Sequence, residues 1–284
     1  MFVDILGAKG ANLCEMFRLG MPVPPAFIIT ADNSLEYFKA GMSNKGYLLP
    51  QELMTDIKKG VTELEHQTNK KFGLGVDQVF DGAPKTPLLL SVRAGSAISM
   101  PGMMDTVLNL GINEFVTEHM GKLMNNHRWA FDTYLRFLQM FGTVVLGVDK
   151  KRYDDILHEM LKSQDVPHES LLSIANMKDV IARFKKIAAV PDDPWEQLDM
   201  AIQAVFRSWN SPLAMKYRDI NNISSEYGTA VTVQSMVFGN LNTQSGSGVA
   251  FTRNPTTGIK ELYGEYLPCS EVENTHQYIY AVSY

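Results

Sequence analysis

Short apolar runs bounded by Gly- and Pro-containing loops predict strands in two separate parts of the chain. Runs of this kind occupy residues 27–30, 88–92, 106–110 and 262–267. Residues 230–238 and 248–252 are also rich in β-branched side chains, and the loop between them is polar and contains Gly and Ser. That arrangement predicts an antiparallel hairpin.

Apolar residues at helical spacing predict helices between these two groups of strands. In residues 112–194 this spacing is carried by Trp129, Tyr134, Phe137, Leu138 and Phe141. A segment with two prolines at residues 190–195 ends the region, and Leu198, Ile202 and Val205 then begin another helix. We therefore predict an α+β fold in which residues 112–194 form a helical insertion.

The composition is that of an ordinary globular protein. Of the 284 residues, 45% are hydrophobic and 20% are charged, and the net charge of −5 gives no support for a nucleic-acid partner. The two cysteines, Cys14 and Cys269, lie far apart in the sequence, which predicts neither a disulfide framework nor a metal site. Neither a signal peptide nor a long apolar run is found, so we expect a cytoplasmic protein without membrane insertion.

One arginine follows a predicted buried strand and precedes a loop of small residues. Arg93 ends the run that begins at residue 88, and the loop after it contains Ser96, Ser99 and Gly102. An arginine offers a fixed fork of donors, and Gly and Ser allow backbone N–H groups to approach phosphate oxygens. The alternative is a structural arginine paired with a carboxylate. Asp105, at the end of the loop, is either part of the site or a turn residue.

Three further residues are candidates for contact with a nucleotide: Lys9, Gln234 and Met236. Lys9 lies in Gly-Ala-Lys-Gly just before a predicted helix, where the helix N-terminus attracts anions, although an exposed lysine at a helix start is the simpler interpretation. Gln234 is an amide within an apolar strand and needs a partner, either an adenine edge or neighbouring backbone. Met236 follows it and is a candidate for packing against a purine face.

Four stretches, in order, resemble one known family. They are Gly-Ala-Lys-Gly-Ala-Asn-Leu-Cys-Glu-Met at 7–16, Ser-Val-Arg-Ala-Gly-Ser-Ala-Ile-Ser-Met-Pro-Gly-Met-Met-Asp-Thr at 91–106, Ala-Val-Phe-Arg-Ser-Trp at 204–209 and Phe-Thr-Arg-Asn-Pro at 251–255. The chain is similar, over residues 6–267, to the N-terminal nucleotide-binding domain of pyruvate, phosphate dikinase, a relative of phosphoenolpyruvate synthase. The sequence Ser-Met-Pro-Gly-Met-Met-Asp-Thr at 99–106 resembles the dikinase more than the synthase.

The resemblance implies an α+β nucleotide-binding domain of the ATP-grasp type. It implies a first lobe at residues 1–111, the helical insertion at 112–194, a second lobe at 195–267 and a divergent tail at 268–284. ATP would lie in a cleft between the lobes, with Mg²⁺ as the metal. The implied ligands of ATP are Lys9, Arg93, Ser96, Gly102, Asp105, Gln234, Met236 and Glu265. Lys9 and Arg93 would assist transfer, and Glu265 would bind the metal unless it is a solvated strand residue.

The family enzyme interconverts pyruvate and phosphoenolpyruvate through a phosphorylated histidine on a mobile domain. None of the six histidines here lies in the Thr-Ser-His-Ala type of sequence that carries phosphate. The resemblance ends near Leu267, before the family's last nucleotide-binding strand, phosphohistidine domain and pyruvate-binding barrel. We therefore expect this chain alone to do no more than hydrolyse ATP slowly. A non-catalytic nucleotide-binding fragment and an interaction module for the missing domains are the alternatives.

Overall fold

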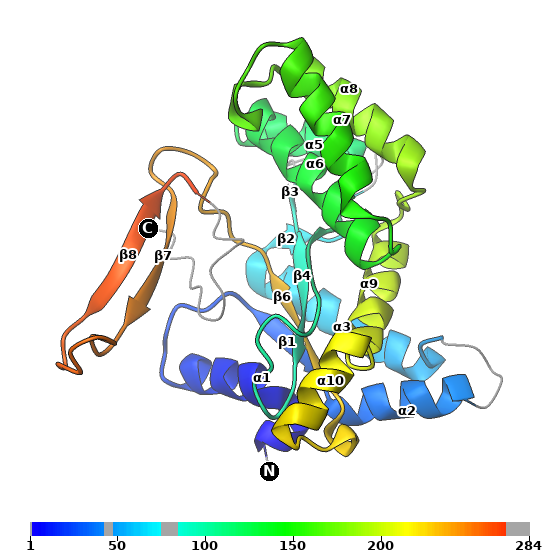
Figure 1. Cartoon of the computed structure of the whole chain (residues 1–284), viewed down its shortest axis with the longest axis vertical. Helices are drawn as coiled ribbons and strands as arrows, with labels where there is room; N and C mark the ends of the chain where they lie inside the picture. The colour runs from blue at the N-terminus through cyan, green and yellow to red at the C-terminus, as the bar shows by residue number, and fades with distance from the viewer. Residues whose placement is uncertain (1, 43–47, 75–84, 271–284) are drawn as a thin grey trace. The chain divides into compact units, whose positions relative to one another are not determined.

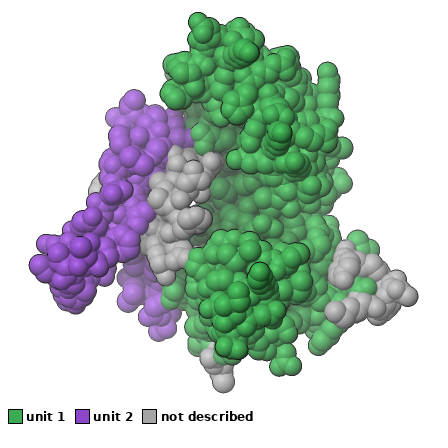
Figure 2. Space-filling view, in the orientation of Figure 1, with its two compact units in different colours: residues 1–14, 25–236 green, residues 15–24, 237–284 purple. Residues whose placement is uncertain are grey.

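The computed structural model describes residues 2–42, 48–74 and 85–270, and it confirms mixed helix and sheet. The chain divides into two compact units, distinguished in Figure 2. One comprises residues 1–14 and 25–236, and the other comprises residues 15–24 and 237–284. Each unit is described separately below. No helix in the described ranges is both long and apolar enough to span a bilayer.

The first unit is organised around a four-stranded antiparallel sheet. Its strands are β1 (Ala26–Ile29), β6 (Ala230–Ser235), β4 (Leu90–Gly95) and β5 (Thr106–Leu110), in that spatial order. Strand β6 lies between β1 and β4, although it is separated from both by the helical part of the sequence (Figure 1). The sheet therefore joins segments that lie far apart along the chain.

The two central strands give the sheet one apolar and one polar face. Side chains alternate along a strand, so Val92 of β4 and its partner Val233 of β6 share one face, while Arg93 and its partner Thr232 share the other. The apolar face packs against α2 (Ala31–Met42), α3 (Gln51–Thr68) and α9 (Pro194–Ser208). The polar face carries the sequence-predicted site residues that belong to the two central strands, Arg93 and Gln234.

A separate helical layer follows β5. It consists of α5 (Glu114–Leu123), α6 (His127–Val144), α7 (Lys150–Ser163) and α8 (Ile174–Ile187), which pack on one another. Side chains of Asn113, Asn126, Asp149 and Ser173 accept hydrogen bonds from the first-turn N–H groups of these helices. All four helices fall within residues 112–194, where helical spacing predicted them.

The remaining elements of the first unit are short. Strands β2 (Lys70–Lys71) and β3 (Thr86–Pro87) pair in parallel beside α3. Helix α10 (Pro212–Asn221) follows α9 and is capped by Ser211, whose hydroxyl oxygen accepts from the N–H of Ala214. Single 3₁₀ turns occur at Glu169–Leu171 and Ser225–Tyr227.

The predicted hairpin between residues 230–238 and 248–252 is wrong. Both edges of β6 are occupied by β1 and β4, and the later segment forms β7 (Gly246–Phe251), which pairs with β8 (Tyr263–Pro268) in the second unit. The pairing of β6 with the early strands also means that the predicted lobe boundary at residue 195 does not coincide with the division into units. Most of the predicted tail at 268–284 lies outside the described residues.

Candidate functional site

Helix α1 (Phe2–Arg18) is fastened to the end of β4 by a close backbone contact at Gly7. This glycine has φ 69° and ψ 163°, a conformation open almost only to glycine, and it breaks the helix locally. A Cβ at Gly7 would lie 2.0 Å from the carbonyl oxygen of Gly95. The N–H of Ala8 donates to the carbonyl oxygen of Ser96 over 2.9 Å. The contact therefore holds the part of α1 that follows Gly7 against Gly95, which lies two residues after Arg93 in the sequence.

A second glycine brings the same helix onto the polar face of the sheet. A Cβ at Gly10 would lie 2.8 Å from the Cδ1 atom of Ile28, which pairs with Thr232 and so shares the face of Arg93. Lys9 lies between the two glycines. The sequence prediction placed it just before a helix, whereas it occupies the first turn after the break at Gly7.

Lys9 and Arg93 are neighbouring cations without an acidic partner in the described part of the chain. The Lys9 side chain is accessible to solvent, but surrounding protein and the nearby Arg93 charge lower the pKa of its ammonium group. Burial likewise lowers the pKa of the Arg93 guanidinium. Two like charges held together without compensation favour an anionic ligand.

No carboxylate in the described ranges pairs with Arg93, so the alternative of a structural ion pair finds no support there. The Nε atom of Arg93 is buried and has no hydrogen-bond partner there. A buried N–H donor without an acceptor is costly, and in native structures it usually indicates a missing ligand, ion or water. The Arg93 guanidinium therefore combines a free N–H donor with a positive charge that no described carboxylate neutralises.

The loop between β4 and β5 is held in place by its own side chains. The hydroxyl of Ser96 donates to the carbonyl oxygen of Ile98. Met100 is 5% exposed and packs with Trp209, with Met103 and Met104 beside them. Gly102 lies at the exposed turn with φ +70°, and no atom comes within 4 Å of a Cβ built on it. The loop is thus anchored by methionines, and its glycine end is open.

Asp105 directly precedes Thr106, which pairs with Arg93 across β4 and β5. Its backbone N–H donates to the hydroxyl oxygen of Ser208 on α9 over 3.3 Å, and α9 covers the apolar side of the sheet. Burial raises the pKa of its carboxyl group. The described geometry therefore places Asp105 on the support of the loop, and its proposed contact with the nucleotide stays a prediction.

Gln234 and Met236 continue the polar face away from the cations. Gln234 pairs with Ser91 in β4, while Arg93 pairs with Thr232, so Gln234 is the diagonal neighbour of Arg93, about 7–8 Å away. The N–H of Met236 donates to the carbonyl oxygen of Leu89 over 2.9 Å. Arg93 in β4, Gln234 in β6 and Met236 just after β6 therefore follow one another on two adjacent strands. Sequence reasoning expected Gln234 to be misplaced among apolar neighbours, whereas it belongs to a distinct polar face.

Two polar residues of this face, Ser91 and Thr232, were missed in the sequence. A signal was available, because apolar and polar residues alternate in both central strands. In β4 the order is Leu90, Ser91, Val92, Arg93, and in β6 it is Val231, Thr232, Val233, Gln234. The period of two marks a sheet with two different faces.

Glu265 belongs to the second unit, where it lies in β8 opposite Val249 and is exposed. The turn between β7 and β8 is closed by its own contacts, since the Arg253 guanidinium donates to the carbonyl oxygen of Gly258 and Asn254 donates to Glu261 over 3.0 Å. The described residues contain no cluster of three or more His, Cys, Asp or Glu side chains able to hold a metal. Glu265 could thus supply one carboxylate but not a complete metal site.

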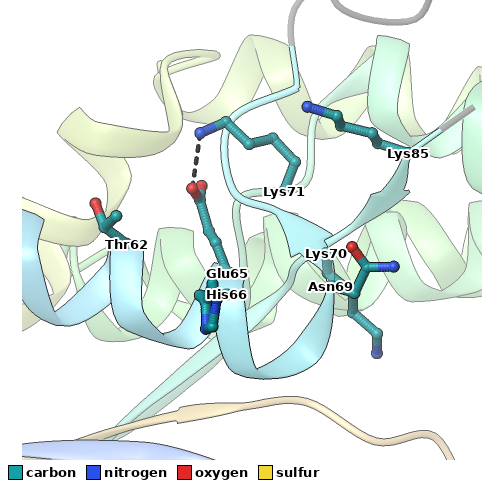
Figure 3. A pocket seen from close by; sticks show the side chains of 7 residues that line it. All are labelled: Thr62, Glu65, His66, Asn69, Lys70, Lys71 and Lys85. Atoms are coloured by element: carbon teal, nitrogen blue, oxygen red, sulfur yellow. Dashed lines mark hydrogen bonds and ion pairs between the residues drawn. The ribbon is translucent and has the colours of Figure 1, made fainter. Parts of the chain in front are cut away.

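A polar pocket in the first unit contains none of the predicted site residues. It lies between α3 and the β2–β3 pair, has a volume near 290 Å³, and is shown in Figure 3. Its lining residues are Thr62, Glu65, His66, Asn69, Lys70, Lys71 and Lys85. The Glu65 carboxylate neutralises Lys71 over 2.7 Å and accepts from the N–H of Phe72 over 2.9 Å. We therefore place the candidate site on the sheet face instead.

Comparison with known proteins identifies the family of the chain. The profile of the family described as "Pyruvate phosphate dikinase, AMP/ATP-binding domain" matches residues 3–266. Pyruvate, phosphate dikinase of Clostridium symbiosum is 44% identical over 93% of this chain and 29% of its own length. The chloroplastic enzyme of Flaveria trinervia is 45% identical over 93% of this chain and 27% of its own length.

A third relative, pyruvate, phosphate dikinase 1 of Arabidopsis thaliana, is 43% identical over 95% of this chain and 27% of its own length. The chain thus spans less than a third of the length of these curated relatives, 27–29%. The family match includes the positions of Lys9, Arg93, Gln234 and Glu265. The chain belongs to the AMP/ATP-binding domain family of pyruvate phosphate dikinase.

Proposed function

We propose that this chain is the nucleotide-binding part of a pyruvate, phosphate dikinase-like phosphotransferase and that it binds ATP along the polar face of its sheet. The observation that carries the proposal is the pair of uncompensated cations, Lys9 and Arg93, with an unused donor on Arg93. In this arrangement the phosphates of ATP lie at Lys9 and Arg93, and the adenine lies toward Gln234 and Met236. We propose that the domain is of the ATP-grasp type.

The chemistry of such a site is positioning and neutralisation of charge. Lysine and arginine stabilise the charge that spreads over the transferred phosphoryl group, and no covalent step falls to the protein at this stage. Ser96 and Gly102 would contribute backbone and hydroxyl contacts from the loop, and Asp105 would support that loop. A histidine on a mobile domain of the complete enzyme is the proposed acceptor, which makes phosphoenolpyruvate and pyruvate substrates of the whole protein.

Magnesium fits the proposed site only in the presence of the nucleotide. Mg²⁺ is commonly held by one or two carboxylates together with phosphate oxygens, and it supplies further charge neutralisation when bound. Glu265 is the proposed carboxylate, with the nucleotide as the other source of oxygen ligands. A single exposed carboxylate holds the ion weakly by itself, so we expect no strong binding of Mg²⁺ to the free chain.

Calorimetry with ATP tests the proposal. The folded 284-residue chain should bind ATP and release measurable heat, and it should prefer ATP to GTP because Gln234 and Met236 suit an adenine. Added Mg²⁺ should strengthen ATP binding in the wild-type chain and less so in Glu265→Gln. The exposed Glu226→Gln serves as the matched control and should respond to Mg²⁺ as the wild type does.

Absence of heat with ATP at millimolar concentration, from a sample whose folding is verified by circular dichroism, would end the proposal. An unchanged response to Mg²⁺ in Glu265→Gln would remove only Glu265 from the metal site and leave the rest intact. Turnover of pyruvate or phosphoenolpyruvate by the isolated chain would contradict the assignment of those steps to the rest of the enzyme.

A further inference from the structure

Thr232 is a buried hydroxyl for which the described structure offers no partner. Its residue is only 4% exposed, and its Oγ1 atom makes no hydrogen bond. It lies in the middle of β6, between Ile28 of β1 and Arg93 of β4. Most buried hydroxyls in native proteins are bonded, often to their own backbone, so an unpaired one at the centre of a sheet needs a partner from outside the chain, which is a water, an ion or a ligand.

Arg93 lies directly opposite Thr232 on the neighbouring strand β4. The Nε atom of Arg93 is also buried and also lacks a partner among the described residues. Paired residues on neighbouring antiparallel strands place their Cβ atoms about 4.5–5.5 Å apart on one face. The two unpaired groups therefore belong to directly opposite residues on the same face of the sheet, and they do not bond to each other.

We propose that Thr232 is a ligand-binding residue whose hydroxyl donates to the same anionic oxygen as the Arg93 Nε–H. An arginine N–H can only donate, and a hydroxyl can rotate to donate, so the group that satisfies both is an acceptor. The adjoining charges of Lys9 and Arg93 favour a charged acceptor over a neutral one. The ligand chemistry is a phosphate oxygen. The inference rests on the proposed function, because it takes the oxygen from the phosphate chain of ATP.

Two substitutions at this position separate a binding role from a structural role. Thr232→Val keeps the shape of the side chain and removes the hydroxyl, whereas Thr232→Ser keeps the hydroxyl. The control is Thr133→Val, because Thr133 is equally buried but its hydroxyl donates to the carbonyl oxygen of Trp129 over 2.9 Å in α6. Calorimetry with ATP, AMP and diphosphate, and thermal unfolding without ligand, are measured for each chain.

We expect Thr232→Val to weaken binding of ATP and diphosphate on the order of tenfold, with a smaller loss for AMP. Thr232→Ser should bind close to the wild type. Without ligand, Thr232→Val should unfold at the same temperature as the wild type or a higher one, because it removes an unpaired polar group from the interior. Thr133→Val should unfold at a lower temperature and bind ATP normally.

Wild-type affinity for ATP and diphosphate in Thr232→Val would overturn the inference. A lower unfolding temperature together with equal losses for ATP and AMP would do the same, because it would make Thr232 structural. The measurement with diphosphate distinguishes the proposed Thr232 contact with phosphate from the proposed binding of ATP as a whole. If ATP fails to bind but diphosphate binds and depends on Thr232, the inferred phosphate contact stands and the adenine site is wrong.

Discussion

A Gly7→Ala chain is expected to lose at least about 2 kcal/mol of folding stability and most of its affinity for ATP. The substitution places a Cβ 2.0 Å from the carbonyl oxygen of Gly95, and it does so in a backbone conformation that alanine avoids. The helix can relieve the clash only by moving away from β4. That movement takes Lys9 away from Arg93 and divides the site.

Denaturant unfolding and calorimetry on the same samples check this result, and Gly147→Ala is the matched control. Gly147 also has a positive φ of +68°, but no atom lies within 4 Å of its built Cβ. It should therefore lose only the cost of backbone strain, about 1 kcal/mol, and bind ATP as the wild type does. A Gly7→Ala chain with the stability and affinity of Gly147→Ala would show that the contact with Gly95 is unimportant.

Replacing Arg93 with methionine is expected to weaken ATP binding by about 10- to 100-fold without destabilising the free protein. The loss corresponds to one charge-assisted hydrogen bond, about 1.5–3 kcal/mol. AMP should lose less, because Arg93 is placed at the outer phosphates. The free protein should gain from the substitution, since an unpaired buried donor and a repulsion with Lys9 both disappear.

Arg183→Met is the control for this substitution. Arg183 forms ion pairs with Asp179 and Glu159 on the helical layer, at 3.1 and 3.3 Å, and half-exposed pairs of this kind contribute little. Its loss should leave binding of ATP and AMP unchanged. Equal losses for ATP and AMP in Arg93→Met would place the arginine at the adenosine half or in the fold, contrary to the account.

The strands and helices of the first unit were largely predictable because their periodicity is local. Apolar and polar residues alternate at 90–94 and 230–234, which already indicates a sheet with two different faces. Only Arg93 and Gln234 were identified as site residues on the polar face. The sequence could not predict that β6 would pair with β1 and β4, since strand pairing over such separations depends on the whole fold. The hairpin prediction failed for the same reason, because sequence proximity suggested the wrong partner for β6.

The proximity of Lys9 to Arg93 was equally hidden in the sequence. It depends on a close approach of Gly7 to Gly95, and a single sequence gives no sign that two glycines separated by the first helices and strands come together. The chemistry of each cation was therefore predictable, while their mutual repulsion was not. The unpaired atoms of Arg93 and Thr232 likewise exist only once β4 and β6 are paired.

The pKa of Lys9, measured with and without ATP, tests the central claim most directly. Nuclear magnetic resonance of the lysine ammonium groups can follow it, with Lys9→Met identifying the signal. In the free protein the pKa should lie below the usual value of 10.5, because the surrounding protein partly desolvates the ammonium group and the Arg93 charge repels it. Bound phosphates should raise it, so ATP binding takes up protons between the two pKa values and weakens as the pH rises through that range. A Lys9 pKa that ATP leaves unchanged, under conditions where ATP binding is saturated, would contradict a phosphate site at Lys9 and Arg93.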